Sequence, residues 1–137
     1  MEFCKTLGIG PFVPRFRPPI RDMRQDGNPI KPQEMKIMFA YFNNAELELI
    51  QPIGDGPWMD FLKQTGGGIQ HLGFWVDDLD KTLSDLEKKG IKAKIIGRRE
   101  KSIGGGMAYL DTLKYCGILI EIGETPAIYT PVMPKTN

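Results

Sequence analysis

The stretch from Gly68 to Gly90 changes from one hydrophobic period to another, and this change constrains the fold more than any other feature of the sequence. Between Ile69 and Val76 the side chains alternate between two faces, as they do in a β-strand. Asp78 follows as a helix N-cap, and Gly90 supplies the C-terminal stop. The apolar stripe between these two residues consists of Leu79, Leu83 and Leu86. The pattern predicts a strand followed directly by an amphipathic helix.

The predicted strand carries His71, which is the only histidine among the 137 residues. Alternation places His71 on one face together with Ile69, Gly73 and Trp75, and the following helix would cover the opposite face. A lone histidine is more often a structural residue than a metal ligand. The rest of the chain therefore has to decide between these two roles.

Composition indicates a single small domain. A chain of 137 residues that is 41% hydrophobic and 26% charged can bury one compact core. A net charge of +1 provides no field that would attract nucleic acid or an anionic membrane. No apolar run approaches the roughly 20 residues of a membrane span, and the two cysteines match no metal or redox spacing. We expect a cytoplasmic protein whose partner is a small molecule, with no nucleic-acid or membrane partner.

Strand patterns also occur on both sides of the central stretch. Residues 35–42 and 46–51 predict a hairpin whose turn is Asn43-Asn44, because asparagine tolerates positive φ. Pro57 then suits the first position of a helix that continues to Thr65. The later strands are predicted over residues 93–96, 107–110 and 117–122.

The N-terminal third is predicted to be irregular. Residues 1–7 have the pattern of the last turns of a helix, and Gly8 follows as its stop. Between residues 9 and 34 the many prolines exclude a long helix and favour an extended segment followed by a long loop. At the other end, the tail from Thr125 is expected to be extended and poorly packed.

The strands over residues 45–50 and 117–122 are near copies of each other, which indicates an internal repeat. Each copy ends a series of strands that follows a helix closed by Gly8 or Gly90. The repeated unit is therefore a strand, a helix and three further strands. The second copy contains every part, whereas only seven residues precede Gly8 in the first. Glu48 and Glu121 occupy similar places in the last strands of the two copies.

These segments carry a family resemblance. Residues 46–52, 61–62, 68–79, 89–91 and 117–121 resemble, in their order and spacing, the vicinal oxygen chelate (glyoxalase/bleomycin resistance/dioxygenase) superfamily, and within it the methylmalonyl-CoA epimerase-like proteins. The resemblance is continuous from about Met35 to Glu124. It implies an α+β fold in which paired βαβββ modules form a curved mixed sheet. Residues 1–137 would then be one glyoxalase-like domain, with an incomplete first module at 1–53, a complete second module at 66–124 and a tail at 125–137.

The resemblance also implies a divalent metal ion, which the family holds with residues from the first and last strands of each module. Glu48, His71 and Glu121 match three of these ligand positions. The fourth, a histidine on the leading strand of the first module, has no counterpart in this sequence, and Ile37 lies near the position of the epimerase's catalytic glutamate. Oxygen-rich ligation favours Co²⁺, Mn²⁺, Ni²⁺ or Mg²⁺ over Zn²⁺.

Two functions fit these residues. The first is a metal-dependent isomerase or lyase that transfers a proton next to a carbonyl, with an acyl-CoA as the expected substrate and Glu121 as the base. Arg15 and Arg17, with the nearby Arg21 and Arg24, would help to hold an acidic substrate. An iron dioxygenase that cleaves aromatic rings is excluded, because it requires two histidines.

The alternative is a non-catalytic protein that binds a small molecule or drug, as in the bleomycin-resistance branch. The cleft would then hold an apolar or cationic ligand against aromatic side chains. The aromatic residues expected to line it are Phe39, Tyr41, Trp75 and Tyr109.

The incomplete first module leads to an expectation about assembly. Without a leading strand, a sheet edge and the apolar face beneath Leu47 and Leu49 would stay uncovered. The prolines between residues 9 and 20 cannot donate the hydrogen bonds that would close this edge within one chain. We therefore expect a homodimer.

Overall fold

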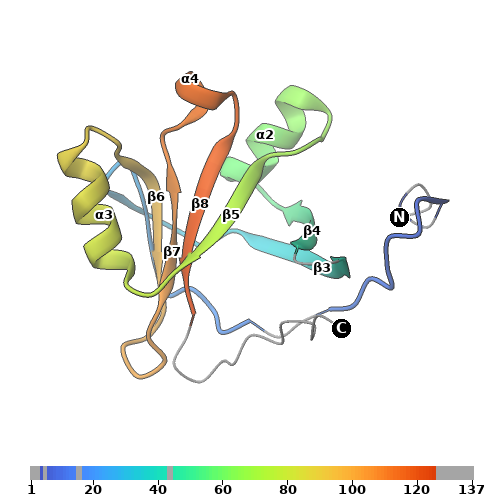
Figure 1. Ribbon diagram of the computed structural model, residues 1–137, viewed down its shortest axis with the longest axis horizontal. Coiled ribbons are helices and arrows are strands. Elements are labelled where there is room, and N and C mark those ends of the chain that lie inside the picture. The colour runs from blue at the N-terminus through green and yellow to red at the C-terminus, as the bar shows by residue number, and fades with distance from the viewer. Residues whose placement is uncertain (1–3, 5, 15–16, 43–44, 126–137) are drawn as a thin grey trace. The chain divides into compact units, whose positions relative to one another are not determined.

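The computed structural model describes Cys4 and residues 6–14, 17–42 and 45–125, and Figure 1 shows their helices and strands. The chain divides into two compact units. The first contains the described residues up to Arg17 together with Gln33–Asp60, and the second contains Pro18–Pro32 and residues 61–125. Within the described residues, no helix has the length and apolar character to cross a membrane.

The second unit is built on a six-stranded mixed sheet. Strands β2 and β5 are its two edge strands, and β5 runs parallel to β8, whereas all other neighbours are antiparallel. In order across the sheet, the strands are β2 (Asn28–Ile30), β1 (Asp22–Gln25), β6 (Ala93–Arg98), β7 (Gly106–Leu110), β8 (Leu119–Glu124) and β5 (His71–Val76). The order β6-β7-β8-β5, with α3 after β5, confirms the βαβββ module predicted for this half of the chain.

Helix α3 (Leu79–Lys88) begins at two side-chain caps. Asp78 Oδ1 accepts a hydrogen bond from Lys81 N at 2.8 Å, and Glu124 Oε2 accepts one from Leu79 N at 2.9 Å. These carboxylates satisfy N–H groups of the first turn that have no partner within the helix. The helix is followed by Gly90 in the left-handed region, with φ of 81°. The predicted cap and stop are confirmed.

The solvent side of α3 carries an ion-pair ladder. Lys81 Nζ lies 2.8 Å from Asp85 Oδ2, and Lys88 Nζ lies 3.0 Å from Asp85 Oδ1. The hydrogen bond from Lys81, helped by Lys88, lowers the pKa of Asp85 to about 2. Because this pKa lies below the value in an unfolded chain, the ladder stabilises the helix above about pH 4 and loses its effect as the pH falls towards 2. Exposed pairs of this kind contribute little to stability at any pH.

Helix α3 lies beside the sheet (Figure 1), and the core of the second unit lies between this helix and one face of the sheet. Leu79 is fully buried there against strands β7 and β8, and the other two leucines of the predicted stripe, Leu83 and Leu86, pack around it. The buried members of this cluster are Leu79, Ala108, Leu110 and Ile122. Because strand side chains alternate, the opposite face of the sheet carries His71 and Glu121.

The first unit contains the predicted hairpin, formed by β3 (Glu34–Phe42) and β4 (Ala45–Ile53). Its turn, Asn43-Asn44, lies outside the described residues. Phe39 pairs with Glu48 across the hairpin and makes an isolated bridge to Val13 on its other side. Helix α2 (Pro57–Thr65) follows, as predicted, and Trp58 in its first turn is buried.

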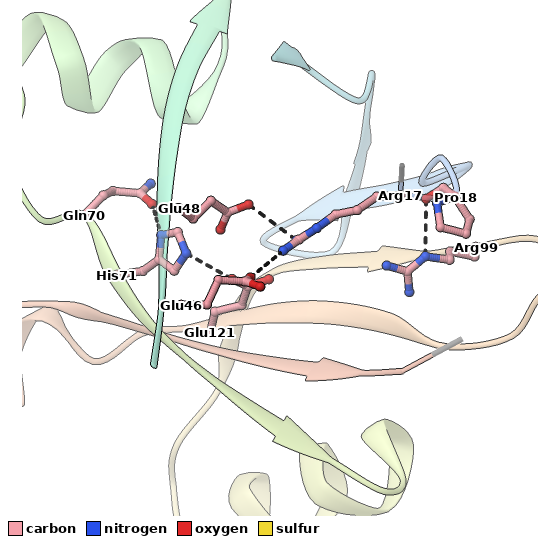
Figure 2. A network of polar contacts seen from close by, with 8 residues as sticks. All are labelled: Arg17, Pro18, Glu46, Glu48, Gln70, His71, Arg99 and Glu121. Carbon is pink, nitrogen blue, oxygen red and sulfur yellow. Dashed lines mark hydrogen bonds and ion pairs between the residues drawn. The ribbon is translucent and has the colours of Figure 1, made fainter. Parts of the chain in front are cut away.

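The long loop predicted before residue 34 is wrong. Residues 22–30 form a second hairpin, β1 and β2, which extends the sheet by pairing with β6. Its two-residue turn is Asp26-Gly27, where both φ angles are positive, at 49° and 81°. Pro29 fits because β2 is the outermost strand, where a missing N–H breaks no ladder. Arg99 Nε donates to the carbonyl of Pro18 at 3.3 Å and so anchors the chain ahead of β1 (Figure 2).

The last strand begins two residues later than predicted. A short helix, α4 (Leu113–Cys116), precedes it, and Gly117 caps this helix with a left-handed φ of 72°. The buried Thr112 hydroxyl donates to Ile118 O at 2.8 Å and accepts from Ile120 N at 2.9 Å. These bonds fix the start of β8 at Leu119. At the N-terminus, Cys4 and Thr6 are helical, in line with the predicted end of a helix, while residues 126–137 lie outside the described residues.

Leu79 supports a first prediction. Leu79→Ala removes a fully buried side chain from the contact between α3 and the sheet and should lower the free energy of unfolding by about 2–5 kcal/mol. Leu113→Ala, at a position that is 51% exposed, is the control and should stay within about 0.5 kcal/mol of wild type. Urea unfolding followed by circular dichroism measures both. Equal losses in the two variants would place the core elsewhere.

Candidate functional site

A histidine and a glutamate meet on the face of the second unit's sheet that α3 does not cover. His71 begins β5, and Glu121 lies in the middle of β8, its parallel neighbour. The distance between His71 Nε2 and Glu121 Oε2 is 3.0 Å. Both side chains are largely shielded from solvent, with exposed fractions of 10% and 15%. The structure thus brings together two of the three predicted metal ligands.

Gln70 determines which nitrogen of His71 faces Glu121. Its Oε1 lies 2.6 Å from His71 Nδ1, on the side of the ring away from the glutamate (Figure 2). An amide oxygen only accepts hydrogen bonds, so Nδ1 carries the ring hydrogen. A neutral imidazole then directs the Nε2 lone pair at the Glu121 carboxylate, which is itself an acceptor. With the ring hydrogen on Nδ1, the 3.0 Å between Nε2 and the carboxylate suits a proton or a metal ion shared by the two groups.

Tyr109 forms a wall beside the pair. It lies on β7 directly across from Glu121, and its ring meets the His71 ring edge-on with centroids 5.2 Å apart. The residue is buried, with 4% of its surface exposed. An edge-to-face contact at this distance is favourable and limits rotation of the imidazole. Tyr109 therefore helps to keep Nε2 directed at Glu121.

The pair has the spacing and the chemistry of metal donors. Two ligands that bind one ion at right angles, with bonds of about 2.1 Å, lie about 3.0 Å apart. His71 Nε2 and Glu121 Oε2 are separated by that distance. The hydrogen bond from Nδ1 to Gln70 is of the kind that orients metal-bound histidines. An imidazole with a carboxylate suits a borderline divalent ion.

Glu48, the third predicted ligand, belongs to the first unit. Its Oε1 lies 3.4 Å from Arg17 Nη1, and Nη2 of the same arginine lies 3.4 Å from Glu46 Oε1 (Figure 2). The Arg17 guanidinium also lies over the Phe39 ring, 4.5 Å from its centroid. Arg17 thus orients both glutamates on one face of β4. The grouping of Glu48 with His71 and Glu121 stays a prediction.

The predicted substrate-binding residues have different surroundings. Arg15 lies outside the described residues. Phe39 is fully buried beneath Arg17, and Tyr41 lies opposite Glu46 in the hairpin. Trp75 is 55% exposed.

The two arginines farther along the chain are on the surface of the second unit. Arg21 lies 3.3 Å from Glu100, and Arg24 lies 3.5 Å from Asp22. All four side chains are more than half exposed. Two of the four arginines considered for substrate binding therefore pair with acidic side chains on this surface.

Gln70 is the site residue that the sequence analysis missed. Strand alternation assigns it to the face opposite His71, yet its side chain reaches the imidazole because it precedes the first residue of β5. The available signal was an amide side chain next to a candidate ligand histidine, since such histidines usually donate their second N–H to an oxygen.

Comparisons with known proteins identify the family of this chain. Residues 1–109 match the Glyoxalase/Bleomycin resistance protein/Dioxygenase superfamily. Mitochondrial methylmalonyl-CoA epimerase of Homo sapiens is 28% identical over 98 residues, which are 70% of this chain and 56% of the human protein. The chain thus spans little more than half the length of this relative.

Two solved structures share the fold. A hypothetical protein from Bacillus halodurans has a TM-score of 0.65 at 19% identity, with 94% of this chain and 85% of that chain covered. A variant of methylmalonyl-CoA epimerase from Streptomyces coelicolor, in complex with 2-nitronate-propionyl-CoA, has a TM-score of 0.56 at 22% identity, with 73% and 78% covered. The sequence match over residues 1–109 shows that this chain belongs to the Glyoxalase/Bleomycin resistance protein/Dioxygenase superfamily.

Proposed function

We propose that this protein is a metal-dependent isomerase that transfers a proton on the carbon next to the carbonyl of an acyl-CoA. The observation that carries the proposal is the 3.0 Å approach of His71 Nε2 to Glu121 Oε2, with Gln70 holding the other ring nitrogen. Two acceptors held in this way form one half of a divalent-cation site. The mitochondrial epimerase relatives and the Streptomyces complex support an acyl-CoA as the substrate class.

His71 and Glu121 would hold the ion, and the family resemblance adds Glu48 as a third ligand. When bound, a divalent ion stabilises negative charge on a carbonyl oxygen and leaves positions open for a chelating substrate. The donor set favours Co²⁺, Mn²⁺, Ni²⁺ or Mg²⁺. Gln70 and Tyr109 keep the imidazole in the tautomer and orientation that binding requires.

Glu121 is the proposed base. Its carboxylate removes the proton from the carbon next to the carbonyl, and the electrons of the broken C–H bond move onto the carbonyl oxygen to give an enolate. Water delivers a proton to the other face of that carbon, which inverts it, and Glu121 then releases the proton it took to solvent, so that its carboxylate is regenerated. A homodimer and a cytoplasmic location remain predictions from the sequence.

The first test of the proposed function is metal affinity. His71→Ala removes the only nitrogen donor and should abolish most binding of Co²⁺ measured by calorimetry. Gln70→Leu keeps the imidazole but loses its orienting acceptor, so affinity should fall about 10–100-fold. Glu87→Gln, on the exposed side of α3, is the matched control and should bind as wild type does.

Equal Co²⁺ affinity in wild type and His71→Ala would show that His71 does not bind the ion, and the proposed metal-dependent reaction at this site would be wrong. Ligand binding that needs no metal would then favour the non-catalytic binding protein.

The second test is proton exchange. With metal present, the protein should exchange the α-proton of methylmalonyl-CoA for solvent deuterium, measured by NMR. Glu121→Gln should reduce the rate by about 10²–10⁴-fold, because it removes the base. Its binding of methylmalonyl-CoA, measured separately by calorimetry, should fall much less. Full exchange in Glu121→Gln would assign the base to another residue.

A further inference from the structure

Trp75 is a large aromatic side chain in an unusual position. It lies on the outer strand β5, and 55% of its surface is exposed. Strand alternation places it on the same face as His71, four residues earlier, and its register partner Gly123 lies two residues beyond Glu121. The indole therefore lies on the sheet face that carries the proposed site, beyond the metal-binding pair along the strands.

The Trp75 ring packs on Gly123, its register partner on β8. A Cβ atom at position 123 would lie 3.1 Å from Trp75 Cζ3 and 3.3 Å from Cε3, closer than side chains ordinarily approach. The six-membered part of the indole therefore rests directly on the backbone of β8. Two residues along a strand correspond to about 7 Å, so the ring lies about that far from Glu121. The absence of a side chain at Gly123 lets the ring pack close to the sheet.

Phe74, the residue before Trp75, shows that exposure alone does not place a ring near the proposed site. Phe74 is 56% exposed, nearly the same as Trp75. Phe74 pairs with Ile122, a core residue on the α3 side, and so lies on the opposite face of β5. Of these two exposed rings, Trp75 is the one on the sheet face that carries His71 and Glu121.

We propose that Trp75 binds the pantetheine arm of the acyl-CoA by stacking on its first amide group. This inference rests on the proposed function, and it identifies the part of the substrate that the protein recognises. With the thioester carbonyl at His71 and Glu121, the arm leaves through the sulfur, and a short ethylene link joins the sulfur to a planar amide. That spacing suits a ring about 7 Å along the strand from Glu121. Aromatic rings stack well on flat groups, and the exposed indole loses water when it is covered.

The test compares adjacent residues. Trp75→Ala should weaken binding of methylmalonyl-CoA about two- to tenfold, as measured by calorimetry with Co²⁺ present. Phe74→Ala removes an equally exposed ring from the opposite face and should leave the affinity unchanged. Co²⁺ affinity should match wild type in both variants, because neither residue touches the metal-binding pair. Equal affinity for methylmalonyl-CoA in wild type and Trp75→Ala would overturn the proposal.

Truncated substrates locate the contact. The methylmalonyl thioester of N-acetylcysteamine retains the first amide, whereas the thioester of ethanethiol lacks it. Trp75→Ala should weaken binding of the first compound and leave that of the second unchanged. Equal weakening of both would show that the ring contacts the acyl group, and the assignment to the pantetheine arm would be wrong.

A second variant tests the packing of the indole on Gly123 without removing the ring. Gly123→Ala places a methyl group against the indole and should tilt it, so binding of methylmalonyl-CoA should be weaker than in wild type, as in Trp75→Ala.

Fluorescence quenching gives an independent measurement. In wild type, methylmalonyl-CoA should protect Trp75 from quenching by acrylamide, and Trp75→Phe should lose this effect because the remaining Trp58 is buried. Unchanged quenching with saturating ligand would contradict the stacking.

The two proposals fail in different ways. Failure of wild type to bind any of the three thioesters would overturn the acyl-CoA assignment and the role of Trp75 with it. Binding and proton exchange that do not depend on Trp75 would overturn only the stacking proposal.

Discussion

The parallel pairing of β5 with β8 is the constraint on which the candidate site depends. These strands are the first and last of a βαβββ unit, separated by about 50 residues of chain, yet their register places Gly73 beside Glu121 and lets His71 reach the same carboxylate. A parallel neighbour requires a crossover connection, and α3 supplies its first part. Glu124, at the end of β8, caps the first turn of that helix. The contacts that hold α3 on the sheet therefore also support the register of the two strands that carry His71 and Glu121.

Local signals in the sequence were sufficient for much of the second unit. The change of period near Asp78, the cap at that residue and the glycine at position 90 each act within a few residues, so the strand and the helix could be predicted from side-chain spacing alone. The proximity of His71 and Glu121 is different, because it depends on which strands become neighbours. Periodicity gave the face on which each residue lies, and the family resemblance gave the pairing.

The errors have physical causes of the same kind. The prolines between residues 9 and 34 favour an extended segment and a long loop, but Pro29 occupies an edge strand, where no ladder bond is lost. The Asp26-Gly27 dipeptide is a strong hairpin signal, but the prediction for this segment followed its proline content instead. The start of β8 was missed because it depends on the buried hydroxyl of Thr112, a tertiary contact. Gln70 escaped notice because alternation fails at the residue that precedes a strand.

Strand alternation separates stability from binding along β5. Val76 points towards α3 and packs against the core, whereas His71, Gly73 and Trp75 point to the other face. Two glycines on that face of β5 and β8, Gly73 and Gly123, have different effects: a Cβ at position 73 would make an ordinary contact of 3.6 Å with Glu121, while one at position 123 would press on Trp75. A substitution on the α3 side of β5 therefore acts mainly on folding, and a substitution one residue away acts on the proposed metal ligands or on the indole instead.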